Sequence, residues 1–308
     1  MKAFVLEDFG AEPRLRDDLP QPEPGDGELA VRVHASSVNP VDNYVAGGMM
    51  RDFATYAFPV IIGRDFAGVV EKAGSGSGFT EGDEIFGFVP ATGPDVHHGA
   101  WAELALVPTG QASAKPAEVD VAAAGAAPVA ALTAIAALDA LELKEGGTLL
   151  IVGATGGVGS FAVQLAKRAG AQVIAPGLPE DEGFLAELGA DHVIDRAGDV
   201  AAQTRELEPG GVQALFDTVS HAPEELEVYA AALGEGGRAA SPTRAAGEAA
   251  GRHNVSASPE DLPRLAEALD DGLRVPIQRS YSLEDAGAAL ADLVGKHTQG
   301  KLAIAVIP

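Results

Sequence analysis

The clearest pattern of hydrophobic and polar positions in this chain runs from Thr148 to Gly170. Its first part, 148–153, is a short apolar run, which is typical of a strand buried on both faces of a parallel sheet. Glycines follow directly, and residues 160–169 then carry apolar side chains at helical spacing until Gly170, a common helix-ending residue. The pattern therefore predicts a strand, a glycine turn and a helix, which together form the phosphate-binding unit of a dinucleotide fold.

The glycine turn fits the G-x-G-x-x-G pattern except at its first position, where Ala154 replaces glycine. Glycines without Cβ atoms let a pyrophosphate approach the backbone, and the helix start offers free N–H groups and a positive dipole end. A tight turn that binds nothing is the alternative interpretation. We predict a cofactor site whose residues here are Gly153, Ala154, Gly156, Gly157, Val158 and Gly159.

The second strand of this unit lacks the acidic residue that would bind a ribose 2′-hydroxyl. Residues 171–175 run into Pro176 and Gly177 with no carboxylate at the expected distance. Because a carboxylate there would repel a 2′-phosphate, its absence favours a site that accepts NADPH.

Helices alternate with strands after the glycine turn, which predicts a parallel doubly wound sheet. The expected helices are 182–188, 204–208 and 224–233, and the expected strands are 192–195, 214–218 and 238–241. Two alanine-rich helices, 121–127 and 129–143, are expected before the turn, with an interruption at Pro128.

The first hundred residues are β-rich and irregular instead. Strand-length runs occupy 2–7, 28–36, 66–72 and 100–107, and Gly and Pro clusters separate them. Residues 28–34 alternate apolar and polar side chains, as in a strand with one buried face. The last segment predicts helices at 259–269 and 283–293 and strands at 275–281 and 301–307. Its strands can extend the nucleotide sheet or return to the first module, and the pattern does not decide.

Composition and charge narrow the function classes. The chain has 308 residues, no cysteine and a net charge of −24. No apolar run is long enough to span a membrane, the N-terminal residues lack a signal peptide's apolar core, and disulfides and thiolate metal sites are excluded, so we expect a cytoplasmic protein. Strong negative charge disfavours nucleic acid and anionic membranes as partners. An anionic cofactor needs local cations, and the candidates are Arg64, Arg196, Arg244 and Lys301.

Separated motifs in a fixed order carry a family resemblance over essentially the whole length. They are Asn39-Pro-Val-Asp42-Asn-Tyr44, Pro59-Val-Ile-Ile-Gly63-Arg-Asp65-Phe-Ala-Gly68, Gly99-Ala-Trp-Ala-Glu103, Ala130-Ala-Leu-Thr133-Ala, the 154–159 turn, Leu188-Gly-Ala-Asp-His-Val-Ile-Asp195 and Gly300-Lys301-Leu. With them the chain resembles the zinc-independent quinone oxidoreductases of the medium-chain dehydrogenase/reductase superfamily.

The resemblance implies an α/β fold in which a Rossmann doubly wound parallel sheet, 123–259, is inserted in a GroES-like β-rich catalytic domain, 1–122 and 260–308. It also implies a homodimer and hydride transfer from NADPH to a quinone or an α,β-unsaturated carbonyl. Zinc-dependent relatives have a Cys and a His where this chain has Asn39 and Arg64, so no zinc is expected.

The resemblance implies two catalytic residues. Asn39 would contact nicotinamide and substrate, and Tyr44 would donate a hydrogen bond to a carbonyl oxygen. Without a metal, hydride transfer needs positioning and a donor near the oxygen that gains charge. A plain turn at Asn39 and a packed aromatic at Tyr44 are the structural alternatives. Further cofactor contacts are expected from Thr133, Ser241 and Lys301.

One departure from the family pattern concerns the 2′-phosphate. Residues 178–183 bring three carboxylates to a place where relatives often have Lys, Ser or Thr. Arg196, after the third strand, is our candidate to bind the phosphate, since guanidinium groups pair bidentately with it. NADPH stays favoured over NADH. His97 and His98 are adjacent, and adjacent histidines on a strand point apart and seldom bind one metal ion, so we expect a mobile loop there and no metal site.

Two other functions stay open. The same fold can serve as a stand-alone enoyl reductase of the polyketide type, although a carrier-bound substrate would call for a basic docking face. Alternatively, the chain can bind the cofactor as a sensor or structural protein without significant turnover.

Overall fold

The chain folds into two compact units, which are described separately. The computed structural model describes residues 1–307, with only the backbone of residues 93–95. The first unit consists of residues 1–129 together with the segment that starts at Pro259, and the second unit consists of Ala130–Ser258. The second unit is therefore inserted in the sequence of the first.

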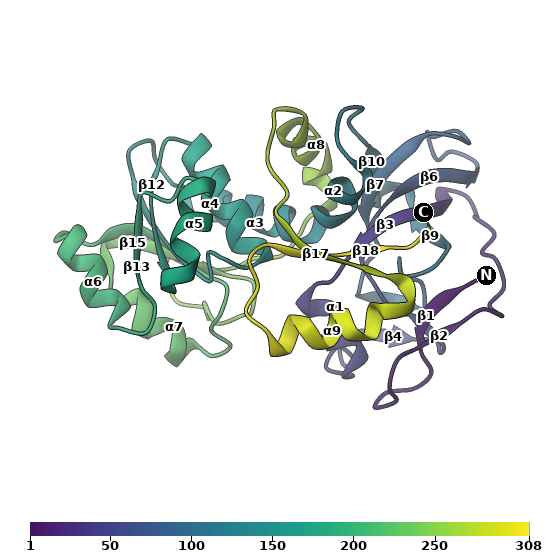
Figure 1. Ribbon diagram of the computed structural model, residues 1–308, viewed down its shortest axis with the longest axis horizontal. Helices are drawn as coiled ribbons and strands as arrows, with labels where there is room; N and C mark the ends of the chain where they lie inside the picture. The colour runs from purple at the N-terminus through teal and green to yellow at the C-terminus, as the bar shows by residue number, and fades with distance from the viewer. Residues whose placement is uncertain (308) are drawn as a thin grey trace. The chain divides into compact units, whose positions relative to one another are not determined.

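The second unit is built on a six-stranded parallel sheet with the order β13-β12-β11-β14-β15-β16. Its strands are β11 (Thr148–Val152), β12 (Gln172–Gly177), β13 (His192–Asp195), β14 (Val212–Asp217), β15 (Leu233–Ser241) and β16 (Arg252–Asn254). Its helices are α3 (Pro128–Leu141), which begins at the boundary of the units, α4 (Gly157–Arg168), α5 (Glu182–Leu188), α6 (Val200–Leu207) and α7 (Pro223–Ala230). Figure 1 shows this unit in teal and green. The predicted doubly wound sheet is confirmed.

The strand order places a switch point at the centre of this sheet. From β11 the chain moves outward through β12 and β13, then returns to the other side of β11 as β14. The connections that leave the carboxyl ends of β11 and β14 thus run in opposite directions, and open α/β sheets bind their ligands at such a switch point.

The first unit is organised around a mostly antiparallel sheet with the strand order β10-β7-β6-β3-β18-β17, and β9 also pairs with β3. These strands are β3 (Glu28–Ser37), β6 (Asp65–Ala73), β7 (Glu84–Phe88), β9 (Leu104–Pro108), β10 (Ala112–Ala114), β17 (Ile277–Ser282) and β18 (Lys301–Ala305). Smaller sheets join β1 (Ala3–Leu6) with β2 (Arg14–Arg16) and β5 (Val60–Ile61), and β4 (Ala54–Tyr56) with β8 (Gly93–Val96). The helices are α1 (Pro40–Ala46), α2 (Val121–Ala126), α8 (Leu262–Asp270) and α9 (Ala286–Gly295).

The last segment returns to the first unit, which settles the question that its sequence pattern left open. Strand β18 pairs antiparallel with β3 through Ala303–Ser37, Ile304–Ser36 and Ala305–Ala35, and it pairs parallel with β17. In Figure 1 these yellow strands lie beside the purple β3. The sheet of the first unit is therefore made from both ends of the described chain.

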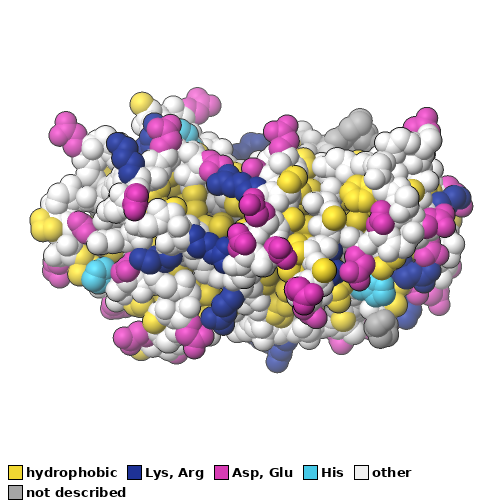
Figure 2. Space-filling view, turned by 90° about the horizontal axis from the view of Figure 1, so that it is seen from above, with side chains coloured by type: hydrophobic (Ala, Val, Ile, Leu, Met, Phe, Trp, Pro, Cys, Tyr) yellow, Lys and Arg dark blue, Asp and Glu magenta, His cyan; other side chains and the backbone are white. Residues whose placement is uncertain are grey.

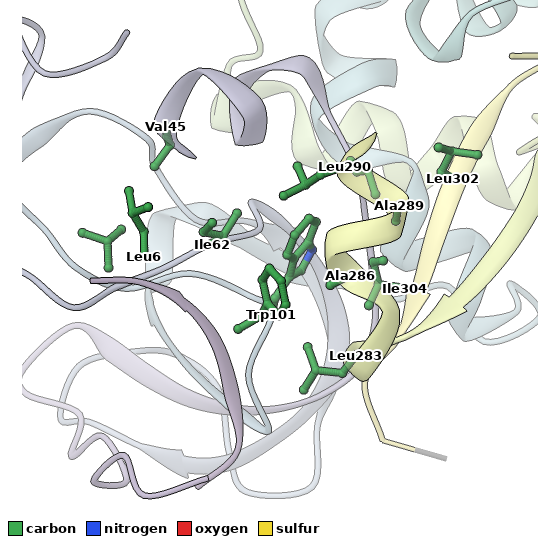
Figure 3. Packing of buried hydrophobic residues seen from close by; sticks show 13 residues of the cluster. Leu6, Val45, Ile62, Trp101, Leu283, Ala286, Ala289, Leu290, Leu302 and Ile304 are labelled. Atoms are coloured by element: carbon green, nitrogen blue, oxygen red, sulfur yellow. The ribbon is translucent and has the colours of Figure 1, made fainter. Parts of the chain in front are cut away.

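Trp101 is the largest side chain in the main core of the first unit. Its indole is fully buried, its ring packs edge-on against Phe4, and its Nε1 donates to the Ser37 carbonyl at 3.2 Å. Figure 3 shows it among Ile62 and side chains of α9, including Ala286 and Leu290. The core therefore joins segments from both ends of the chain.

Several element boundaries differ from those predicted. Helix α6 starts at Val200 and not at 204, because the Asp199 side chain accepts the Ala202 N–H at 2.9 Å and so caps the helix earlier. Helix α7 ends at Ala230, and β15 then starts at Leu233 despite its glycines. Strand β9 starts at Leu104, four residues after the predicted position.

Candidate functional site

The glycine turn lies at the carboxyl end of β11, at the switch point of the parallel sheet. Helix α4 begins after Gly156, whose φ and ψ are −72° and 176°, and no side chain caps its first N–H groups. Such unpaired donors and the positive end of the helix dipole attract an anion. The helix start can therefore bind a phosphate with its backbone.

The glycines of this turn differ in what surrounds them. A Cβ at Gly156 would have only the Gly153 carbonyl oxygen within 4 Å, at 3.5 Å, so the space around it is open. A Cβ at Gly159 would lie 2.1 Å from that same oxygen, and Gly153 has a φ of +82°, which favours glycine. Gly159 and Gly153 thus serve packing and turn geometry, whereas Gly156 leaves room in which a pyrophosphate would fit.

Other predicted cofactor residues lie along the same edge of the sheet. Arg196 follows β13, is exposed, and donates its backbone N–H to the carbonyl of Gly177 at the end of β12 at 3.1 Å. Ser241 ends β15, and its buried hydroxyl is hydrogen-bonded to that of Thr243 at 2.8 Å. Ala154 is buried, and Val158 lies half-buried in the first turn of α4. The carboxyl ends of β11, β12, β13 and β15 thus contribute these residues to one edge.

One of the three carboxylates after β12 faces inward. Asp181 is fully buried, and its Oδ2 accepts the backbone N–H of Leu178 at 2.9 Å. Glu180 and Glu182 are exposed. The negative charge that the loop turns to solvent therefore comes from Glu180 and Glu182.

Thr133 and Arg244 complete the positions predicted for the second unit. Thr133 lies in α3 with 5% of its surface exposed. Arg244 is exposed in the loop after β15 with a φ of +68°, an uncommon value for a residue other than glycine.

In the first unit, Asn39 and Lys301 belong to one buried polar network. Lys301 Nζ donates to Asn39 Oδ1 at 2.5 Å and to the Val38 carbonyl at 3.1 Å. Asn39 Nδ2 donates to Asp65 Oδ2 at 2.7 Å, and Ser37 Oγ donates to the same oxygen at 2.6 Å. Each of these four polar side chains is at most 3% exposed. Asn39 and Lys301, which are 262 positions apart in the sequence, therefore lie in one cluster.

Asp42 and Arg64 lie next to this network. Asp42 Oδ2 accepts the Asn39 backbone N–H at 2.7 Å, which caps the start of α1. Its Oδ1 lies 3.8 Å from Arg64 Nε, and both atoms lack a hydrogen-bond partner. Burial raises the pKa of Asp42 from 3.8 to about 7, and the nearby guanidinium of Arg64 opposes that rise. Burial also lowers the pKa of Arg64 and of Lys301.

Tyr44 lies on α1, two positions after Asp42. It is half-buried, and burial raises the pKa of its hydroxyl. A neutral phenol can donate a hydrogen bond, as the predicted role requires.

Asp65 and Ser37 are the members of the cluster that the sequence did not identify. Asp65 stands within a quoted motif, but its contacts with residues 39 and 301 depend on the pairing of distant strands. The adjacency to Arg64 was the one available signal.

The cluster does not fit a metal ion. Its charged members are two cations, Lys301 and Arg64, beside two carboxylates, and the positive charges would repel a metal. Among the described residues, no group of three or more His, Cys, Asp and Glu side chains could hold one. His97 and His98 lie outside the helices and strands, so the predicted loop is confirmed, and their ring centroids lie 3.7 Å apart. No helix in the described part of the chain is long and apolar enough to cross a membrane.

Two family models match the chain. Residues 25–117 match the alcohol dehydrogenase GroES-like domain, and residues 157–249 match the zinc-binding dehydrogenase model. These segments fall in the first and the second unit, respectively.

Similar proteins include three plant oxidoreductases. The chloroplast envelope quinone oxidoreductase homolog of Arabidopsis thaliana is 36% identical over 71% of this chain and 67% of its own length. The chloroplastic quinone-oxidoreductase QR1 of Triphysaria versicolor is 30% identical over 99% of this chain and 98% of its own. The chloroplastic NADPH-dependent alkenal/one oxidoreductase of Arabidopsis thaliana is 29% identical over 100% of this chain and 80% of its own.

Solved structures resemble the whole chain. The quinone oxidoreductase from Coxiella burnetii is 28% identical with a TM-score of 0.84, over 100% of this chain and 99% of its own. A mycobacterial protein in complex with NADPH is 27% identical with a TM-score of 0.84, over 99% of this chain and 100% of its own.

Proposed function

Because the chain belongs to the zinc-independent quinone oxidoreductases of the medium-chain dehydrogenase/reductase superfamily, we propose that it transfers a hydride from NADPH to a quinone or an α,β-unsaturated carbonyl compound. A relative named as a quinone oxidoreductase aligns over nearly its full length. Another relative is named as an NADPH-dependent alkenal/one oxidoreductase, which supports both the donor and the acceptor class.

The open space at Gly156 is the observation that carries the proposal. It lies at the uncapped start of α4, at the switch point of the sheet. A pyrophosphate is held in such a place by backbone N–H groups and the helix dipole. Gly153, Ala154, Gly156, Gly157, Val158 and Gly159 would line it.

The chain's own residues would position the reactants. Bound NADPH would supply the hydride from its nicotinamide ring. Tyr44 would donate a hydrogen bond to the oxygen of the acceptor, which gains negative charge during the transfer. Asn39 would contact the nicotinamide and the substrate, and Lys301, Thr133 and Ser241 are proposed cofactor contacts.

We assign the preference for NADPH to Arg196. Its exposed guanidinium follows β13, and its backbone is bonded to the end of β12, where a ribose 2′-substituent is expected. Since Asp181 faces inward, two exposed carboxylates and not three oppose a phosphate there. A homodimer is proposed from the family alone. The cytoplasmic location stays a prediction, and the three plant relatives named above are proteins of the chloroplast.

The test is a fluorescence titration of the purified protein with NADPH and with NADH, followed by an acceptor panel that includes a benzoquinone and an enone. We expect tighter binding of NADPH and its oxidation by at least one acceptor. Binding without turnover would favour a sensor, and turnover only with carrier-bound enoyl thioesters would favour an enoyl reductase.

The variant Arg196→Glu tests the cofactor preference separately. It should weaken NADPH binding about tenfold or more and leave NADH binding within a fewfold, because a charge-assisted phosphate contact is replaced by repulsion. Equal losses for both cofactors would remove Arg196 from the phosphate site. Arg205→Glu is the matched control, since that side chain donates to the Ala231 and Leu233 carbonyls.

A further inference from the structure

We propose that Asp65 is a positioning residue that fixes the carboxamide of Asn39, so that Asn39 meets its ligand as a hydrogen-bond donor to a carbonyl oxygen. The inference rests on the proposed function for the identity of that ligand, a nicotinamide or an acceptor carbonyl. The orientation of the carboxamide can be tested without it.

The chemistry of its partners assigns the two ends of the Asn39 carboxamide. Lysine ammonium groups only donate hydrogen bonds, so the atom 2.5 Å from Lys301 Nζ must be the oxygen. An ionised carboxylate only accepts, so the atom 2.7 Å from Asp65 Oδ2 must be the nitrogen. A carboxamide turned by 180° would place its nitrogen against the ammonium and its oxygen against the carboxylate. One orientation is therefore strongly favoured.

These contacts leave Asn39 with one N–H group that can still donate a hydrogen bond to a ligand. Of the two hydrogens on Nδ2, Asp65 takes one, and the other has only Ser37 Oγ at 3.5 Å, the outer limit of a hydrogen bond. The Oδ1 atom already accepts a short bond from the Lys301 ammonium. A carbonyl oxygen in a ligand is thus the group that matches the spare capacity of Asn39.

Asp65 is itself held in place at both carboxylate oxygens and at its backbone. Its Oδ1 accepts the Val129 N–H at 2.7 Å in the first turn of α3, and its Oδ2 accepts Ser37 Oγ at 2.6 Å. The Asp65 carbonyl also accepts Ser36 Oγ at 2.5 Å. The side chain is fully buried at the start of β6. Since residues of β3 and α3 both donate to it, the carboxylate gives Asn39 a fixed partner.

The charges around Asn39 favour strong donation. Lys301 Nζ lies 3.7 Å from Asp65 Oδ2, and Arg64 faces Asp42 next to them. The network thus pairs each buried cation with a carboxyl group, as a buried charge requires. Because the ammonium draws electron density toward Asn39 Oδ1, it makes the Nδ2 hydrogens more acidic.

The first experiment replaces Asp65 by asparagine in the full-length protein. In D65N, if the new Oδ1 keeps the Val129 N–H, the new NH2 faces the NH2 of Asn39, and two donors oppose each other. We expect kcat for the best acceptor to fall about tenfold to a hundredfold, with the Kd for NADPH within about twofold. Asp191→Asn is the matched control, because Asp191 also accepts from a lysine and a backbone N–H, those of Lys167 and Val173. This control should lower stability and leave kcat unchanged.

A side-chain swap separates positioning from mere stability. The double variant Asn39→Asp, Asp65→Asn keeps one carboxylate and one carboxamide beside Lys301, so most of the thermal stability lost in D65N should return. Position 39 then carries an acceptor in place of a donor, and kcat should stay low. Recovery of both stability and turnover would overturn the proposal.

Side-chain amide spectroscopy reads the orientation directly and does not depend on turnover. The chain contains only three asparagines, at positions 39, 43 and 254, so labelling with 15N-asparagine gives a simple spectrum. We expect D65N to shift the Asn39 NH2 signals and D191N to leave them in place. Unchanged Asn39 signals in D65N would refute the positioning role. If none of the acceptors supports NADPH oxidation by the wild type, the proposed function fails. The Asn39 signals would still show whether Asp65 orients the Asn39 carboxamide.

Discussion

At the scale of single residues, Asp42 links folding to pH. Burial raises its pKa from 3.8 to about 7, so in this range the folded state holds a proton that the unfolded state has lost. Stability therefore falls as the pH rises from about 4 to about 7, and the contribution of the neutral carboxyl is complete below that window. Near neutral pH this carboxyl group is in mid-titration.

We predict that Asp42→Asn makes the free energy of unfolding less dependent on pH. The asparagine can still accept the Asn39 N–H and no longer ionises, so the wild type should lose about 1 kcal/mol per pH unit more than the variant across this window. Denaturant unfolding of both proteins at pH 5, 6, 7 and 8 measures the difference. Parallel curves would mean that Asp42 is ionised throughout.

The polar network also shows what sequence reading misses at this scale. Asn39, Tyr44 and Lys301 could be named because short motifs contain them. The hydrogen bond between Asn39 and Asp65 could not be predicted, since it depends on the position of β3, β6 and β18 in one sheet. A contact between distant residues leaves no local pattern.

At the scale of elements, the glycine turn was predictable because its signals are local. An apolar strand, a run of glycines and a helical spacing all fall within 23 consecutive residues, Thr148 to Gly170. Element boundaries were harder to predict from the sequence. Asp199 caps α6 and so extends it, and the glycine-rich start of β15 becomes a strand by pairing with β14. The pattern also could not choose between two sheets for β18, because either one buries the same apolar residues.

We predict opposite effects for two alanine substitutions in the turn. Gly156→Ala should keep the fold and weaken NADPH binding about tenfold or more, because its methyl group enters the space proposed for the pyrophosphate. Gly159→Ala should destabilise the protein by about 1–3 kcal/mol, because its Cβ would lie 2.1 Å from the Gly153 oxygen.

Thermal unfolding and cofactor titration of both variants separate these effects. Full cofactor affinity in a folded Gly156→Ala protein would contradict the assigned phosphate site, and an unchanged Tm in Gly159→Ala would contradict the packing role. Gly110→Ala is a control, since a Cβ there meets nothing within 4 Å.

At the scale of the whole molecule, the first unit depends on residues from both ends of the described chain. Leu302 and Ile304 of β18 are buried in its main core with Trp101 (Figure 3). Acidic and basic side chains are spread over the face in Figure 2, and the net charge is −24. Such a surface charge aids solubility and does not determine the fold, which depends on the buried clusters.

We predict that ending the chain after Gly300 unfolds the first unit. The deletion removes β18 and leaves β3 and β17 with unpaired edges, and it opens cavities at Leu302 and Ile304. Near-ultraviolet circular dichroism of the single tryptophan, Trp101, reports on this unit. Ending the chain after Val306 keeps β18 and serves as the control. An unchanged tryptophan signal after the longer deletion would show that β18 is dispensable.

The insertion of one unit within the other has a consequence during translation. Asp42, Arg64 and Asp65 leave the ribosome early, and the whole inserted unit follows before Lys301 is made. Because the first unit needs β18 to close its sheet, these side chains stay in contact with water until the last strand is made. The arrival of β18 therefore closes the sheet and brings Lys301 to Asp65 in the same step.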